Sequence, residues 1–89
     1  MNILFIGWCK HDNHDKVWGI IDKGNNICQT FWGRRGKKFQ TNSKMMSVAE
    51  RHALVRSKLN KGYCEVAKED WDTVYDHFGR DVFKLLLKG

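Results

Sequence analysis

The first half of the chain alternates between apolar runs of strand length and short polar stretches. Residues 2–8 and 17–22 are apolar, and residues 27–34 alternate in polarity, as is typical of strands. Residues 23–26 contain glycine and two asparagines, which tolerate the positive φ of a tight hairpin. With a fourth strand expected over residues 39–42, the pattern predicts an antiparallel meander that has one face to cover.

Residues 47–62 carry the signals of one helix. Ser47 and Glu50 match a capping box, and Gly62 is a typical left-handed stop. A core stripe is predicted at four- and three-residue steps, through Val48, His52, Val55 and Leu59. A histidine on such a stripe is more typical of a core position than of a catalytic one. Leu54 would point away from the stripe, where it has no evident partner.

Residues 67–89 form a second helical region. A first helix would bury one apolar stripe, made of Ala67, Trp71, Val74, Tyr75 and Phe78, and Asp81 would cap a last helix. The stripe is too apolar to stay in water, so the first helix is expected to dock on the outer side of the preceding helix and cover Leu54. Its acidic residues would then lie away from the basic turn after the third strand. The alternative is a dimer or partner surface.

Together these elements predict one α+β domain. A small antiparallel β-sheet is covered by one helix, and a C-terminal helical extension packs on the same domain. Three cysteines show no pairing pattern, and the start of the chain lacks the basic and apolar pattern of a signal peptide, so a cytoplasmic location is expected. No apolar run approaches the roughly 20 residues that a membrane span needs, and no membrane partner is expected.

The net charge of +6 is distributed unevenly along the chain. Residues 33–61 carry nine basic side chains against one acid, whereas residues 65–81 carry six acids against two basic side chains. A basic middle and an acidic end indicate a polyanionic partner on one side of the molecule. A solvated surface on a basic protein is the alternative explanation.

The third strand ends in chemistry that fits a sugar–phosphate ligand. Trp32 and Arg34 would project from one face, so that an indole could stack while a guanidinium fork binds phosphate oxygens. Gly33 between them would allow a backbone or ligand to approach closely. Further cations follow at once, namely Arg35, Lys37 and Lys38. Trp32 could otherwise be a core tryptophan.

Residues 32–34, Trp-Gly-Arg, resemble the signature of the WGR domain, the DNA-binding module of poly(ADP-ribose) polymerases and of many small bacterial proteins. The likeness continues on both sides, in residues 15–20 (DKVWGI) and in residues 58–63 (KLNKGY). It covers roughly residues 1–66, which are identified as a WGR-like domain, and leaves residues 67–89 outside.

The resemblance implies DNA binding without catalysis and without sequence specificity. Strand ends or nicks of double-stranded DNA are the candidate positions of this contact. Carried over onto this sequence, it assigns Trp32 to stacking on a terminal sugar and Arg34 to phosphate contact. Position and charge, rather than the family motif, add Arg35, Lys37, Lys38 and Lys44 to the expected DNA-binding residues. Unlike the polymerases, these 89 residues include no zinc-finger or catalytic domain, which puts an expected preference for breaks in doubt.

Two other function classes stay open. The chain could be a protein–protein adaptor or inhibitor that uses the Trp32 surface or the acidic C-terminal helix. It could also bind a metal through Cys9, His11 and His14, which lie in an expected polar loop over residues 9–15, although their spacing matches no common zinc pattern. Neither a cofactor nor a metal is expected. No catalytic site is predicted, because no cysteine has the histidine partner that a nucleophile needs.

Overall fold

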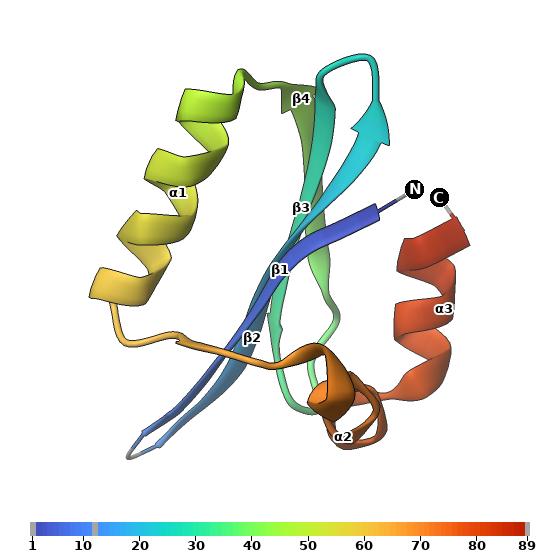
Figure 1. The fold of residues 1–89 in the computed structure, drawn as a ribbon. Coiled ribbons are helices and arrows are strands. Elements are labelled where there is room, and N and C mark those ends of the chain that lie inside the picture. The colour runs from blue at the N-terminus through green and yellow to red at the C-terminus, as the bar shows by residue number, and fades with distance from the viewer. Residues whose placement is uncertain (1, 12, 89) are drawn as a thin grey trace.

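A five-stranded antiparallel sheet lies between two layers of helix in the computed structural model, which describes residues 2–11 and 13–88 (Figure 1). The strands are β1 (Asn2–His11), β2 (His14–Gly24), β3 (Ile27–Arg34), β4 (Gln40–Met45) and β5 (Cys64–Glu65), in the sheet order β4-β3-β2-β1-β5. One face is covered by α1 (Val48–Asn60). The other carries the short 3-10 turn η1 (Lys68–Asp70), α2 (Trp71–Phe78) and α3 (Arg80–Lys88). The predicted α+β fold is confirmed.

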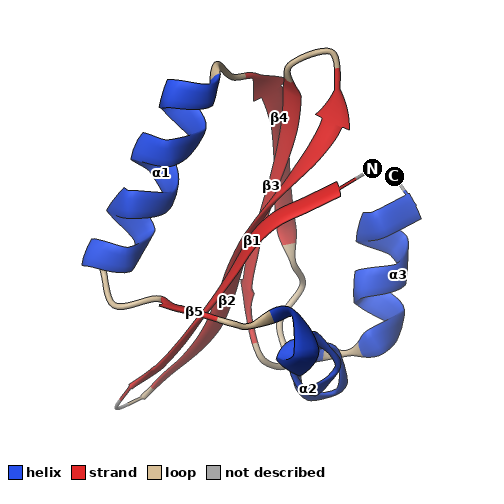
Figure 2. Cartoon of the chain, in the orientation of Figure 1, coloured by secondary structure: helices blue, strands red, loops and turns tan. Residues whose placement is uncertain are grey.

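The β1–β2 hairpin is longer than the sequence indicated, and its arms extend past the helices (Figure 2). Residues 9–15 were expected to form a loop, but the pairing continues to His11 opposite His14. Backbone hydrogen bonds form this ladder regardless of side-chain polarity, which is why a polar sequence did not reveal it. Asp12 lies outside the described residues.

The turn between β2 and β3 has the predicted chemistry. Asn25 and Asn26 have φ values of 55° and 63°, in the left-handed region that asparagine tolerates. The carbonyl oxygen of Asn26 also accepts a hydrogen bond from the backbone N–H of Met46, at 2.8 Å, which ties this turn to the segment that leads into α1.

Both faces of the sheet are buried, so the prediction of one face to cover was wrong. The α1 face carries a core of Phe5, Cys9, Trp18, Ile20, Cys28, Met46 and Tyr63. The opposite face carries a core of Ile6, Val17, Ile21, Phe31, Val74, Phe78, Phe83 and Leu86. Residues 17–21 contain no polar side chain, so neither face of this strand is polar. Such a continuous apolar run is typical of a strand that is buried on both faces.

Helix α1 begins as predicted and faces the sheet differently from the prediction. The Ser47 Oγ accepts a hydrogen bond from the Glu50 N–H at 3.2 Å, and the Ser47 N–H donates to the Glu50 carboxylate at 3.3 Å. Gly62 follows the helix with a φ of 102°. However, the stripe members Val48 and Leu59 are 61% and 44% exposed, and a third member, His52, is exposed as well.

The side of α1 that meets the sheet is instead rotated toward Leu54, which packs half-buried against the α1-face core together with Val55. Leu54 therefore has a partner that the sequence did not reveal. A helix with few strongly apolar residues leaves its rotation to be set by the shape of the sheet beneath it, rather than by its own pattern.

The C-terminal helices cover the second face of the sheet, so the expectation that they dock on α1 was wrong. Phe83 of α3 contacts the rings of Phe31, Phe39 and Tyr75, with centroids 5.6, 5.6 and 4.7 Å away. The Trp71 indole N–H donates to the Val66 carbonyl at 3.1 Å. An uncovered apolar sheet face is larger than the side of one helix, so it attracts these helices more strongly.

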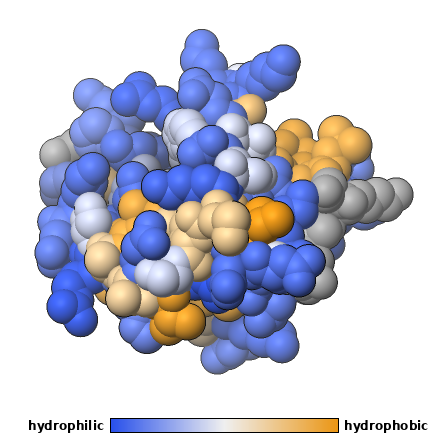
Figure 3. Space-filling model, turned by 90° about the horizontal axis from the view of Figure 1, so that it is seen from above, coloured by the Kyte–Doolittle hydropathy of each residue, from blue (hydrophilic) through white to orange (hydrophobic). Residues whose placement is uncertain are grey.

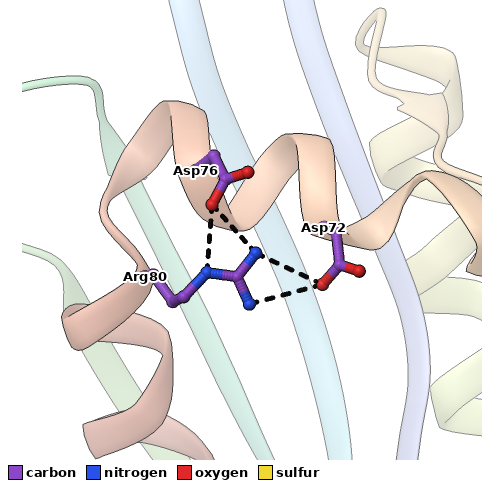
Figure 4. Close-up of polar contacts among 3 residues, drawn as sticks. All are labelled: Asp72, Asp76 and Arg80. Atoms are coloured by element: carbon purple, nitrogen blue, oxygen red, sulfur yellow. Dashed lines mark hydrogen bonds and ion pairs between the residues drawn. The ribbon is translucent and has the colours of Figure 1, made fainter.

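Helix α2 lies beside the basic turn after β3, and the expected placement of its acidic residues away from that turn stays a prediction. Phe78 of α2 packs against Phe39, directly after that turn, with ring centroids 6.2 Å apart. On the outer side, Asp72 and Asp76 share Arg80, which hydrogen-bonds to Asp76 at 3.0 Å through its Nε (Figure 4). Asp81, expected to cap α3, lies in the first turn of that helix instead.

On the side seen from above, the surface is mostly hydrophilic and carries a few apolar patches between its polar residues (Figure 3). Within residues 2–11 and 13–88, no helix combines the length and the apolar character that crossing a membrane requires.

Candidate nucleic-acid interface

The α1 face contains an open cavity of about 300 Å³ beside Trp32. Its apolar wall is formed by residues of the sheet side and of helix α1, namely Trp18, Met46, Leu54 and Tyr63. Its polar groups are Thr30, Asn42, Lys44 and Lys58. The Thr30 hydroxyl donates a hydrogen bond to the Asn42 carbonyl at 3.3 Å, which joins β3 to the exposed edge strand β4.

Trp32 is half-buried at this cavity rather than enclosed in the core. It lies opposite Trp18 on β2 and opposite Gln40 on β4. Trp18 is only 3% exposed and belongs to the core, so the two paired tryptophans differ in role. The outer indole therefore keeps one surface available for a flat ligand, as stacking requires.

The cavity is positively charged, and lysines lie over its aromatic floor. The Lys58 Nζ is 5.4 Å from the centre of the Trp18 ring, and the Lys16 Nζ is 5.6 Å from the centre of the Tyr63 ring. Both distances fit cation–π contacts. Burial lowers the pKa of Lys58, and the neighbouring charges of Lys61 and Lys16 lower it further. Cations that repel one another in this way would gain from a bound anion.

Arg34 adds a further positive charge at the end of β3. It is exposed, and it lies opposite Lys16 in the register of β2 and β3. Burial raises the pKa of the Tyr63 hydroxyl, with a further contribution from Cys9, and the charge of Arg34 partly offsets this rise. Arg34 follows Trp32 by two positions on β3 and so belongs to the same face of the strand, in agreement with this effect of its charge on Tyr63.

Four cations of this region have no acidic partner among residues 2–11 and 13–88. They are Lys16, Arg34, Lys44 and Lys58. The acids that form ion pairs in the described chain instead pair with Arg35, Arg51 and Arg80, and Asp15 also contacts His77. Other described cations, such as Lys10, Arg56 and Lys84, also have no acidic partner, so what distinguishes this region is that its four unpaired cations lie near a half-buried tryptophan.

Gly33 has a packing role, which corrects its assignment to close ligand approach. A Cβ at this position would lie 2.2 Å from a ring carbon of Phe39, on the sheet face away from Trp32. Phe39 in turn packs against the core under α2 and α3. Glycine is therefore required because an aromatic side chain occupies the place of its side chain.

Arg35 is turned away from the cavity and is already neutralised. Its Nε lies 3.2 Å from the Asp15 carboxylate, which also accepts a hydrogen bond from the Trp8 indole at 2.8 Å and contacts the His77 Nε2 at 2.7 Å. Burial opposes the charge of Asp15, but these hydrogen bonds and the charges of His77 and Arg35 outweigh it and lower its pKa. Asp15 thus links the basic turn to α2.

The structure brings together only part of the predicted set of DNA-binding residues. Trp32 and Lys44 both line the cavity, and Arg34 lies on the same face. Lys37 and Lys38 are exposed in the turn, where the Lys37 N–H donates to the Arg34 carbonyl at 3.0 Å.

Sequence reasoning missed Lys58 and Tyr63, which line the cavity, and Lys16, which lies over the Tyr63 ring. Lys16 precedes Trp18 by two positions and so shares its face of β2, a signal that was available in the sequence. Lys58 could not be found in this way, because the rotation of α1 decides where its side chain points.

The proposed metal ligands do not form a site in the described part of the chain. Cys9, His11 and His14 border one surface cavity of about 510 Å³, together with Cys64. However, no group of three or more histidine, cysteine, aspartate or glutamate residues in residues 2–11 and 13–88 is placed to hold a metal ion. Cys9 is 5% exposed within the α1-face core.

Comparisons with protein-family models, with curated proteins and with solved structures found no match for this chain. The resemblance to the WGR domain therefore remains a hypothesis that rests on the residues quoted for it.

Proposed function

We propose that this chain binds DNA without catalysis and without sequence specificity. The indole of Trp32 would stack on the sugar or base of a nucleotide while the surrounding cations contact phosphates. The observation that carries the proposal is the cluster of Lys16, Arg34, Lys44 and Lys58 around a half-buried tryptophan, with no acidic partner in the described chain. Counterion release drives this kind of binding.

A strand end or a nick is the proposed position of Trp32 on double-stranded DNA. An indole within a cavity can reach a sugar or base face only where base stacking is interrupted. This proposal agrees with the resemblance to the WGR domain, and it excludes Gly33 and Arg35 from the contact set. The three cysteines are free thiols, which supports a reducing, cytoplasmic compartment as part of the proposal.

Titration with four forms of DNA tests the proposal. Blunt, nicked, single-stranded and intact circular DNA would be compared at about 50 and 200 mM salt. We expect micromolar dissociation constants and, for duplex DNA, a slope of log affinity against log salt of about −3 to −4, from three to four neutralised phosphates. Circular DNA should bind more weakly than nicked DNA. Absence of binding at the lower salt concentration would contradict the proposed function.

A further inference from the structure

A second groove lies on the opposite side of α1 from the Trp32 cavity. It has a volume of about 460 Å³ and is mainly apolar, with a wall of Leu4, Phe5, Ile20, Val48, Val55 and Leu59. Leu4, Val48 and Leu59 are 39%, 61% and 44% exposed, although large apolar side chains are usually buried. All four members of the predicted core stripe thus border this unfilled groove, and of these Val55 also packs against the α1-face core.

The edge of the sheet beside this groove is open. Strand β5 pairs with β1 only at Gly7 and Trp8, and the Val66 N–H then donates to the Ile6 carbonyl at 2.9 Å before the chain leaves for α2. Within the described residues, the outer edge of β1 from Asn2 to Phe5 therefore has no neighbouring strand. Such an edge presents backbone donors and acceptors to an added strand.

The polar residues of the groove are mostly basic. Arg51, His52 and Arg56 border it, against the single acid Glu65. The Arg51 side chain is only 13% exposed, and its Nη1 lies 3.5 Å from the Asp22 carboxylate. Its Nε is buried and has no hydrogen-bond partner among the described residues. Arg51 thus has hydrogen-bonding capacity that Asp22 does not use, and the positive charges of Arg51 and Arg56 would attract a carboxylate into the groove.

We propose that the groove binds an extended segment of a partner protein, which adds a strand to β1 and carries a carboxylate among apolar side chains. An added strand would lie in the plane of the sheet beneath the exposed part of α1, so alternate side chains would point into the groove. Its apolar side chains would cover Leu4, Val48 and Leu59, and its acid would meet Arg51 or Arg56. This site is independent of the proposed DNA function.

The probe is a short peptide with blocked ends, in which threonine occupies every second position. Valine, glutamate and leucine occupy the positions between the threonines, so these three side chains share one face of the extended peptide. Titration would be followed through the backbone amide signals of the ¹⁵N-labelled full chain. We expect saturable shifts at Leu4, Val48 and Leu59, with a dissociation constant of about 0.1–1 mM. A peptide with lysine in place of glutamate should bind at least roughly tenfold more weakly.

Two matched variants test the location. Val48→Glu places an acid in the first turn of α1, which helices tolerate, and should weaken binding of the glutamate peptide at least roughly tenfold. Leu85→Glu changes a similarly exposed leucine on α3 and should leave the affinity unchanged. Trp32→Ala should also leave it unchanged, so failure of the DNA proposal would not affect this result.

Several results would overturn the inference. They are an absence of saturable shifts, equal binding of the lysine peptide, and equal binding of a peptide whose edge-facing amides are N-methylated. Concentration-dependent shifts at the same residues without peptide would assign the groove to a second copy of this chain instead.

Discussion

Trp32 is the residue on which the proposed interface depends. Its indole lines the cavity and is half-buried, while its strand partner Trp18 is enclosed by the core. Removing the indole should therefore remove a contact surface without collapsing the domain.

Trp32→Ala is expected to weaken binding to a blunt duplex by about 1–3 kcal/mol, the usual contribution of one stacked base. The salt slope should stay unchanged, because the indole carries no charge. Fluorescence anisotropy with a labelled duplex measures both quantities, and Trp32→Phe is the matched control that keeps a ring. Loss of cooperative urea unfolding in Trp32→Ala would show that Trp32 is a core residue.

Lys58 should contribute to binding at no cost to stability. Burial and the charges of Lys61 and Lys16 lower its pKa, so the folded state disfavours its charged form. Lys58→Met should reduce the magnitude of the salt slope by about 0.9, for one lost phosphate contact, and leave the free energy of unfolding unchanged or higher. The control is Lys84→Met on the exposed side of α3, which should alter neither quantity. A steep loss of stability in Lys58→Met would contradict this account.

Asp15 should make stability depend on pH in the acid range. Its pKa in the folded state lies below the ordinary value of 3.8, so the unfolded state binds the proton more readily. Its stabilising contribution is therefore complete above the unfolded pKa and is lost as the pH falls through the folded pKa.

Asp15→Asn should accordingly lower the free energy of unfolding by about 1–2 kcal/mol at pH 7, because the side chain accepts charged hydrogen bonds while partly exposed. The difference from the unsubstituted chain should shrink below about pH 4. Urea unfolding between pH 2.5 and 7 measures this. A difference that stays constant over that range would mean that the Asp15 charge does not stabilise the fold.

At the scale of elements, the helices α2 and α3 cover the second face of the sheet. Phe83 of α3 is 2% exposed and contacts three aromatic rings, whereas its neighbour Leu85 is 74% exposed. The two residues therefore test whether α3 is packed on the sheet.

Phe83→Ala should lower the free energy of unfolding by about 3–5 kcal/mol, through lost apolar burial and a cavity. Leu85→Ala should change it by less than about 0.5 kcal/mol. Urea denaturation of both variants gives the comparison. Equal effects would mean that α3 does not cover this face in solution.

The sequence predicts local elements well and their packing poorly. The four long strands, the capping box at Ser47 and the stop at Gly62 follow from residues that act within a few positions of one another. The rotation of α1 and the docking of α2 depend on which sheet face has apolar area to cover. The apolar run over residues 17–21 carried that information, because a strand with only one covered face would alternate.

In the candidate site too, the residues that local spacing predicts differ from those that only the folded chain brings together. The shared face of Trp32 and Arg34 follows from strand alternation, which needs only their spacing. Lys58 and Tyr63 reach the cavity from distant parts of the sequence, so no local pattern could assign them. The removal of Gly33 and Arg35 from the site depends on Phe39 and Asp15, which contact them only in the folded chain.

At the scale of the whole molecule, α1 separates two surfaces with different chemistry. On one side lies the Trp32 cavity with its unpaired cations, and on the other lies the apolar groove bordered by Arg51 and Arg56. The elements η1, α2 and α3 on the far face carry five of the ten acidic residues, and Arg80 forms ion pairs there with both Asp72 and Asp76. This charge distribution should orient DNA toward the α1 face.

The indole N–H signals of the four tryptophans provide the most direct test of the central claim. Trp8 and Trp71 donate hydrogen bonds on the far side of the sheet, to Asp15 and to Val66, and so serve as internal controls. When a short blunt duplex is added to the ¹⁵N-labelled chain, the Trp32 signal should shift and saturate with the binding curve, while those of Trp8 and Trp71 stay in place. Saturating shifts of Trp8 or Trp71 without a shift of Trp32 would contradict the proposed interface.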